Sequence, residues 1–172
     1  MTGHEIIVVD GVAPTERGRA RGHALRADLP AAVDLYFDLF RTVGIDEATV
    51  CSDAERITDV IGRWDSRYVD EIVGVADGAG LDPWRVMAVN ARTEILAQAL
   101  GSRPGECSTI GCVPETGAPF GIQTWDWHQE LDPFWHLHDV RGTTHAYVGL
   151  TEHGILGKNG VNSASLGLFF HI

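Results

Sequence analysis

The first hundred residues carry apolar positions mostly at helical spacing, after one short apolar strand at residues 5–11. Pro14 and the pair Asp82-Pro83 suit helix starts, because a proline in the first turn gives up no intrahelical hydrogen bond. Apolar stripes and glycine or proline breaks set the other limits. The predicted helices run from about 14 to 29, 31 to 42, 53 to 63, 68 to 78 or 80, and 83 to 96.

The pattern changes after an exposed Gly/Pro loop at residues 101–106. Short apolar runs separated by turn signals then predict strands joined in an antiparallel sheet. These strands cover residues 107–113, 119–126, 135–140, 144–151, 155–158 and 166–171, with Asn159-Gly160 as one of the turns. Helices followed by antiparallel strands predict the α+β class.

The composition of the 172 residues, 44% of them apolar, fits one globular domain. A net charge of −11 argues against a nucleic-acid or anionic-membrane surface, since both attract clustered basic residues. No apolar run reaches the roughly 20 residues of a membrane span, and the first residues lack a secretory signal pattern. Three cysteines, an odd number, favour a reducing, cytoplasmic location over a disulfide framework.

One predicted hairpin brings a thiol and a carboxylate together. If Thr116-Gly117 forms a two-residue turn, Thr109 faces Thr124 and Cys107 faces Asp126 on the same side of the strand pair. A register slip of one residue would move Asp126 to the other face. Cys107 and Cys112 lie too far apart along one strand for a disulfide.

The loop before Cys107 is the kind of exposed segment where chains are cut. Cleavage between Glu106 and Cys107 would give Cys107 a free α-amine, whose ordinary pKa near 8 suits a general base at neutral pH. One residue would then supply both the nucleophile and its base. Asp126 would orient that amine and favour its ammonium form.

Four ordered motifs now give a resemblance that runs from about residue 5 to the last residue. They are Asn90-Ala91-Arg92-Thr93-Glu94-Ile95, Cys107-Ser108-Thr109, Gln123-Thr124-Trp125-Asp126-Trp127 and Gly157-Lys158-Asn159-Gly160-Val161-Asn162-Ser163-Ala164. Together they resemble the acyl-coenzyme A:6-aminopenicillanic acid acyltransferase and carcinine hydrolase-like family of N-terminal nucleophile hydrolases.

The resemblance implies an αββα sandwich, of which residues 1–172 would be the N-terminal part. Residues 1–106 would precede the self-cleavage site and residues 107–172 would begin at the nucleophile, Cys107, with Asp126 as its aspartate. The enzyme would act on a small-molecule amide or acyl donor, with an acyl-coenzyme A co-substrate as one option and no cofactor or metal. This chain departs from the family at Glu106, where glycine is common, and in having no counterpart of the oxyanion asparagine at 168–170.

Several further residues are candidates for the site. Arg92 and Glu94 would brace the loop before Cys107, while Ser108 and Thr109 would help to position the scissile carbonyl. Trp125 and Trp127 are candidates for lining an acyl pocket, and core packing is the competing interpretation for aromatic residues on strands.

Other interpretations stay open. Cys107 could be a small buried core residue, and His136 with His138 on one strand face could belong to a zinc site, although no zinc motif supports it. Lys158, the only lysine, is interpreted as a turn residue. The chain could also be a catalytically silent fragment or binding module, associating through an unfinished sheet edge.

Overall fold

The computed structural model describes residues 6–100 and 107–170, and these form a mixed α+β structure, as predicted. The helices are α1 Pro14–Ala24, α2 Leu29–Thr42, α3 Glu47–Ala79, α4 Pro83–Asn90 and α5 Arg92–Leu100, with a 3-10 turn at Gln129–Leu131. The strands are β1 Ile6–Asp10, β2 Thr109–Cys112, β3 Phe120–Gln123, β4 Trp135–Arg141, β5 Tyr147–Glu152, β6 Asn159–Asn162 and β7 Gly167–Leu168.

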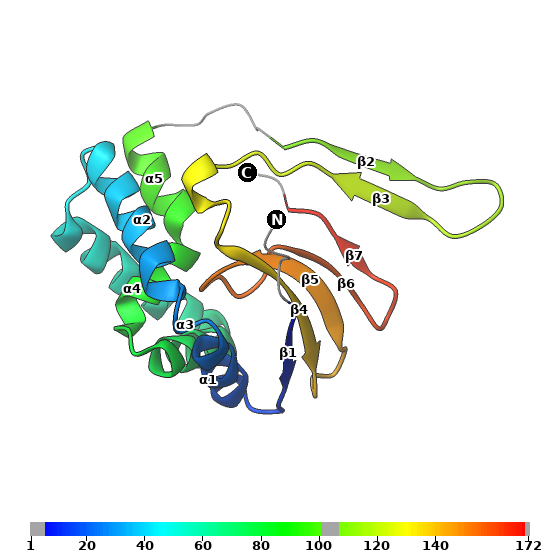
Figure 1. The fold of residues 1–172 in the computed structure, drawn as a ribbon, viewed down its shortest axis with the longest axis horizontal. Coiled ribbons are helices and arrows are strands. Elements are labelled where there is room, and N and C mark those ends of the chain that lie inside the picture. The colour runs from blue at the N-terminus through cyan, green and yellow to red at the C-terminus, as the bar shows by residue number, and fades with distance from the viewer. Residues whose placement is uncertain (1–5, 101–106, 171–172) are drawn as a thin grey trace.

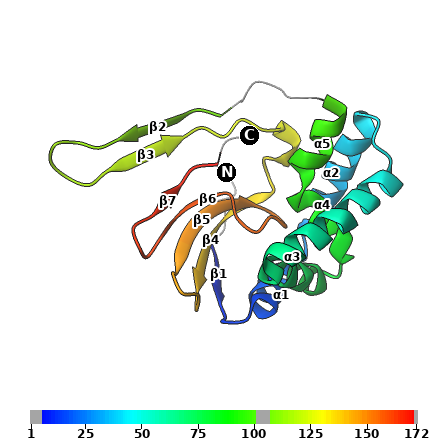
Figure 2. The same cartoon turned by 180° about the vertical axis from the view of Figure 1, so that it is seen from behind.

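The strands form two separate sheets. Five of them pair in the order β1-β4-β5-β6-β7, while β2 and β3 form a hairpin of their own. The helices gather on one side of the five-stranded sheet, and the hairpin extends away from them (Figure 1). The view from behind shows β7 between the hairpin and the other strands (Figure 2). The pairs among β2 to β7 are antiparallel, as predicted, whereas β1, for which no partner was predicted, runs parallel to β4.

The two faces of the five-stranded sheet have different surroundings. Ile7 and Val9 are buried, and so are His136, His138 and Val140 on the neighbouring strand. The opposite face is apolar and open, since Ile6, Val8, Val148 and Val161 are each about half exposed. Across that open face, Val148 of β5 pairs directly with Val161 of β6.

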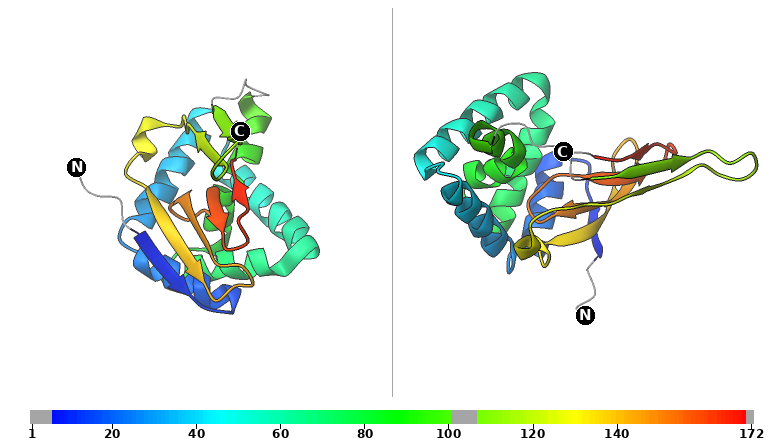
Figure 3. Two further views of the ribbon diagram at one scale, coloured as in Figure 1. Left: turned by 90° about the vertical axis from the view of Figure 1, so that its right-hand side faces the viewer. Right: turned by 90° about the horizontal axis from the view of Figure 1, so that it is seen from above.

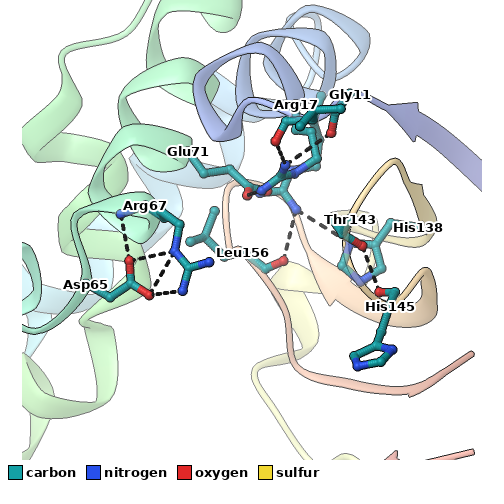
Figure 4. A network of polar contacts seen from close by, with 11 residues as sticks. Gly11, Arg17, Asp65, Arg67, Glu71, His138, Thr143, His145 and Leu156 are labelled. Atoms are coloured by element: carbon teal, nitrogen blue, oxygen red, sulfur yellow. Dashed lines mark hydrogen bonds and ion pairs between the residues drawn. The ribbon is translucent and has the colours of Figure 1, made fainter. Parts of the chain in front are cut away.

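Helices α1 and α3 pack with their backbones in close contact, which depends on two glycines in each helix. A Cβ added at Gly18, Gly22, Gly74 or Gly78 would lie less than 3.0 Å from the backbone of the other helix. Arg17 strengthens this contact by donating to the Gly11 carbonyl and to Glu71 of α3 (Figure 4).

Two predicted helix limits are wrong for identifiable reasons. Helix α3 begins at Glu47 rather than at residue 53, because the Asp46 carboxylate caps it by accepting from the Thr49 N–H at 2.8 Å. Non-helical backbone at Asp65 kinks α3, and the Asp65 side chain caps the second half. The predicted helix 83–96 is two helices, since α4 ends at Asn90 and α5 begins at Arg92.

The β2–β3 hairpin has a longer loop than the predicted two-residue turn. Its ladder pairs Cys112 with Phe120 and Thr109 with Gln123, so residues 113–119 form the loop. Pro114 and Pro119 lie near the two ends of this loop, and neither has an N–H to donate to a ladder. The register is therefore one residue away from the prediction.

Residues 155–158 form a connection, and the predicted turn at Asn159-Gly160 begins β6 instead. Ile155 bonds back to the end of β5, and the backbone of Leu156 bonds to helix side chains. Arg21 donates to the Leu156 carbonyl at 3.0 Å, and the Leu156 N–H donates to the Asn90 side chain at 3.0 Å. This places Lys158 at the helix side of the sheet.

The segment after β7 links the hairpin to the larger sheet. The Phe170 N–H donates to the side-chain oxygen of Gln123 at 3.1 Å, and the side-chain NH2 of Gln123 donates to the Phe170 carbonyl. Two further views show this segment next to β3 (Figure 3). The open end of the hairpin is thus held beside the segment that follows β7, the edge strand of the five-stranded sheet.

Candidate active site

Cys107 lies at the start of the described hairpin and is half-buried with a free thiol. The next residue pairs across the hairpin: the Thr124 N–H donates to the Ser108 carbonyl at 2.9 Å, and the Ser108 N–H donates to the Thr124 hydroxyl at 3.0 Å. Continuing this register by one residue places Cys107 opposite Trp125. All three cysteines are free, as the strand geometry predicted for Cys107 and Cys112.

The predicted pairing of Cys107 with Asp126 is wrong, because the register differs by one residue. Successive side chains on a strand point to opposite faces, so Asp126 lies away from Trp125. The Asp126 side chain is exposed, and no hydrogen bond or ion pair within residues 6–100 and 107–170 holds it. Its catalytic role stays a prediction.

A buried ion cluster joins Arg92 to Glu152 and Lys158. Glu152, at the end of β5, accepts from Lys158 Nζ at 2.8 Å and from Arg92 at 2.8 Å. All three side chains are at most 4% exposed. The Tyr36 hydroxyl of α2 donates to the second oxygen of Glu152. A buried carboxylate is thus satisfied by two cations and one phenol, as a buried charge requires.

The two tryptophans of the predicted pocket contact these cations. Lys158 Nζ lies 3.9 Å from the ring centroid of Trp125 and 5.5 Å from that of Trp127, within cation–π range. Arg92 lies 5.5 Å from the Trp127 ring, and the Trp127 N–H donates to the Tyr36 hydroxyl at 2.9 Å. Their role in binding an acyl group stays a prediction.

The cluster changes the proton affinity of its members. Burial lowers the pKa of Lys158 to about 8, against the opposing effect of Glu152, and nearby Arg92 lowers it further. The charge of Cys107 acts in the other direction and raises the pKa of Lys158. Burial also raises the pKa of Tyr36, so its hydroxyl stays neutral and donates to Glu152.

The supporting residues fall in different places. Arg92 is buried in the ion cluster, whereas Glu94 is exposed and accepts from the Thr93 hydroxyl at 2.9 Å, so the two do not act together. Ser108 is exposed and Thr109 is half-buried in β2. Glu106 and the loop that Arg92 was expected to brace lie outside the described residues.

Sequence reasoning missed Glu152, Lys158 and Tyr36 as members of one site. One available signal was that Lys158 is the only lysine in a chain of 172 residues. The interpretation of Lys158 as a turn residue is wrong, because the side chain is buried and ion-paired. The three residues come from distant segments, and no local motif relates them.

The histidines of β4 share one buried face, as predicted, and pack beside helix α1. His138 Nδ1 lies 3.5 Å from Arg21, and His136 Nδ1 lies 3.2 Å from His153 Nδ1 (His138 is shown in Figure 4). Burial, and then the charge of Arg21, lowers the pKa of His138 to about 4. No group of three His, Cys, Asp or Glu side chains among the described residues is placed to hold a metal ion.

Two comparisons with known proteins bear on this site. No protein-family model matches the chain. In an alignment 165 positions long that covers 92% of the chain, the chain is 29% identical to the 40 kDa form of acyl-coenzyme A:6-aminopenicillanic-acid acyltransferase from Emericella nidulans. It spans 44% of the length of that relative. Within the described residues, no helix is long and apolar enough to cross a membrane. The chain is therefore a distant relative of an acyltransferase.

Proposed function

We propose that this protein is a cysteine-dependent acyltransferase or amidohydrolase whose nucleophile is Cys107. The observation that carries the proposal is the position of Cys107 opposite Trp125, whose ring contacts the buried, ion-paired ammonium of Lys158, in a chain distantly related to an acyltransferase. Reactive cysteines occupy such partly exposed, electropositive surroundings, whereas structural cysteines are enclosed by apolar groups. Arg92 and Lys158 provide two cations against the single carboxylate of Glu152.

The proposed enzyme first cleaves itself before Cys107. The Cys107 sulfur attacks the carbonyl carbon of Glu106, the peptide C–N bond breaks as the acyl group moves to sulfur, and the nitrogen takes up a proton. Water then cleaves the thioester, which leaves a carboxyl group on Glu106 and a free thiol and amine on Cys107. The new α-amine has an ordinary pKa close to neutral pH and can serve as the base.

Acyl transfer then uses the two groups of Cys107. The α-amine accepts the thiol proton as sulfur attacks the acyl carbonyl, and the resulting ammonium gives its proton to the leaving amine or thiol. Water or a second amine attacks the acyl-cysteine and regenerates the thiol. The substrate would be a small-molecule amide or an acyl thioester such as an acyl-coenzyme A. In this proposal Asp126 orients the α-amine after cleavage.

The proposal includes a larger fold of the N-terminal nucleophile type. Helices α1 to α5 and the five-stranded sheet would supply one helical layer and one sheet layer of an αββα sandwich. The open apolar face with Ile6, Val8, Val148 and Val161 supports this, because a second sheet layer would bury it. Residues 1–106 would be the segment before the cut and residues 107–172 the start of the mature catalytic part.

Mass spectrometry of the purified chain tests the self-cleavage. We expect a fragment that begins at Cys107 to accumulate, to be absent from Cys107→Ala and to form normally in Cys112→Ala. A chain that stays whole through prolonged incubation would contradict the self-cleavage. That result would favour the second candidate function, a catalytically silent binding module that uses the open sheet face.

A further inference from the structure

The most unusual buried group of the described chain is the Lys158 ammonium. Its side chain is 1% exposed, and it is held on one side by Glu152 at 2.8 Å and on the other by the Trp125 ring at 3.9 Å. A lysine so deeply buried without a functional demand is rare, because burial disfavours the charged form. An apolar side chain at this position would be removed from water at a lower free-energy cost, so packing alone does not explain why a charged residue is found here.

The geometry relates this ammonium to the nucleophile. Trp125 lies opposite Cys107 in the hairpin register, and its ring carries Lys158. The charge of Cys107 raises the pKa of Lys158. Residues directly opposite each other in a strand pair point to the same face, so the ammonium on the Trp125 ring lies on the face of the hairpin that carries the Cys107 thiol.

The other groups facing Lys158 leave the cluster electropositive. Arg92 from α5 and Glu152 from β5 are both charged, and Tyr36 from α2 is neutral because burial raises its pKa. With Lys158 protonated, the described cluster has two cations, Lys158 and Arg92, and one carboxylate, Glu152, so its net charge is positive.

We propose that Lys158 is a positioning residue that acts through Cys107: its ammonium, fixed by Glu152 and Trp125, favours the thiolate before self-cleavage. After cleavage the same positive charge would disfavour a second cation on the Cys107 α-amine, which keeps that amine in the base form. Only this second role rests on the proposed function. The first concerns the thiol of the uncut chain as well.

The first experiment follows alkylation of Cys107 by iodoacetamide as a function of pH, with each cysteine resolved by peptide mass spectrometry. An opposite charge close to a thiol shifts its titration by at least about one pH unit. We therefore expect Lys158→Met to raise the pH midpoint for Cys107 by about one unit, with alkylation near pH 7 slowed about tenfold. Lys158→Arg, which keeps the charge, should restore most of the rate. Cys51 and Cys112 are internal controls that should not change.

The second experiment keeps the lysine and removes its partner. Because Lys158 is the only lysine, labelling the chain with ¹⁵N- or ¹³C-lysine gives one side-chain signal without any assignment. We expect the titration midpoint of this signal to fall in Cys107→Ala and to stay in place in the matched variant Cys112→Ala. This measurement tests the interaction between Lys158 and Cys107 even if Lys158→Met fails to fold, because it keeps the lysine.

An unchanged lysine midpoint in Cys107→Ala would overturn the proposal. An alkylation midpoint that is the same for Lys158→Met, Lys158→Arg and the original chain would also overturn it. Both readouts work on the uncut chain, so they are independent of self-cleavage. A chain that never cuts itself but shows both shifts would refute the proposed function and leave the role of Lys158 intact.

Discussion

Substituting Gly22 by alanine should destabilise the protein, although alanine is the better helix former. A Cβ at Gly22 would lie 2.9 Å from the carbonyl carbon and 3.0 Å from the Cα of Val75 in α3, where ordinary contact begins at 3.4 Å. Both neighbours are backbone atoms of a buried helix, so no side chain can move aside. The Val75 carbonyl oxygen would be closer still, so helices α1 and α3 would have to separate to relieve the overlap.

The magnitude follows from two opposing effects. Alanine gains about 1 kcal/mol of helix propensity over glycine, whereas overpacking a tight interface costs about 1–3 kcal/mol and more where backbone must shift. The contact runs along both helices through Gly18, Gly74 and Gly78, so separation at one point loosens the others. We expect a net loss of about 2 kcal/mol, which lowers the Tm by roughly 4–8 °C in a chain of this size.

Gly62→Ala is the matched control, because it adds the same methyl group to α3 in open surroundings. Its Cβ would meet only a Val69 methyl group, at 3.8 Å, so the propensity gain should appear alone as a small rise in Tm. Thermal unfolding followed by circular dichroism compares the two variants. If Gly22→Ala melts as high as Gly62→Ala, the close backbone packing of α1 on α3 is wrong.

Three further predictions concern the buried polar groups and Asp126. Because burial lowers the pKa of His138 to about 4 from an unfolded value near 6.5, the unfolded state binds more protons, and stability should fall as the pH drops below 6.5. Between pH 7 and pH 5 the free energy of unfolding, measured in urea, should fall by about 2 kcal/mol less in His138→Asn than in the original chain. If His138→Asn shows the same pH dependence of stability as the exposed control His145→Asn, the prediction is wrong. In the same assay Arg92→Met should lower the free energy of unfolding by about 3 kcal/mol, because Glu152 loses a buried partner. Arg141→Met, which removes a surface ion pair, should lower it by less than about 1 kcal/mol, and equal losses would refute the buried pair. Asp126→Asn should leave the Tm unchanged, because the side chain is exposed, but slow any acyl transfer; full activity would remove Asp126 from the site.

Much of the fold could be predicted from local patterns. The helix at Pro14 and the helix at Pro83 begin where a proline allows a helix to start, and Gly44 and Gly80 follow helix ends with left-handed backbone. These signals are local because capping and turn geometry involve only neighbouring residues. The α+β class followed from them.

The hairpin register could not be predicted, because it depended on where the ladder ended rather than on the turn residues alone. Thr116-Gly117 allowed a tight turn, but the prolines at 114 and 119 stopped the ladder on both sides of it. A shift of one residue was enough to exchange Asp126 for Trp125 as the neighbour of Cys107.

The ion cluster was beyond any local argument. Tyr36, Arg92, Glu152 and Lys158 come from α2, α5, the end of β5 and the connection after it. Their meeting depends on how the helix layer packs on the sheet, which the glycine contacts of α1 and α3 help to set. The resemblance predicted Cys107 as the nucleophile, whereas the placement of Lys158 on the ring of Trp125, opposite Cys107, depends on the three-dimensional structure.

Trapping an acyl group on the protein tests the central claim, acyl transfer through Cys107, most directly. The chain is incubated with an acyl-coenzyme A, quenched in acid and digested, and the three cysteine peptides are compared by mass spectrometry. The account predicts one acyl group on the Cys107 peptide, with none on Cys51 or Cys112, and its release on addition of an amine. Equal low-level labelling of all three cysteines, or labelling that persists unchanged in Cys107→Ala, would contradict it.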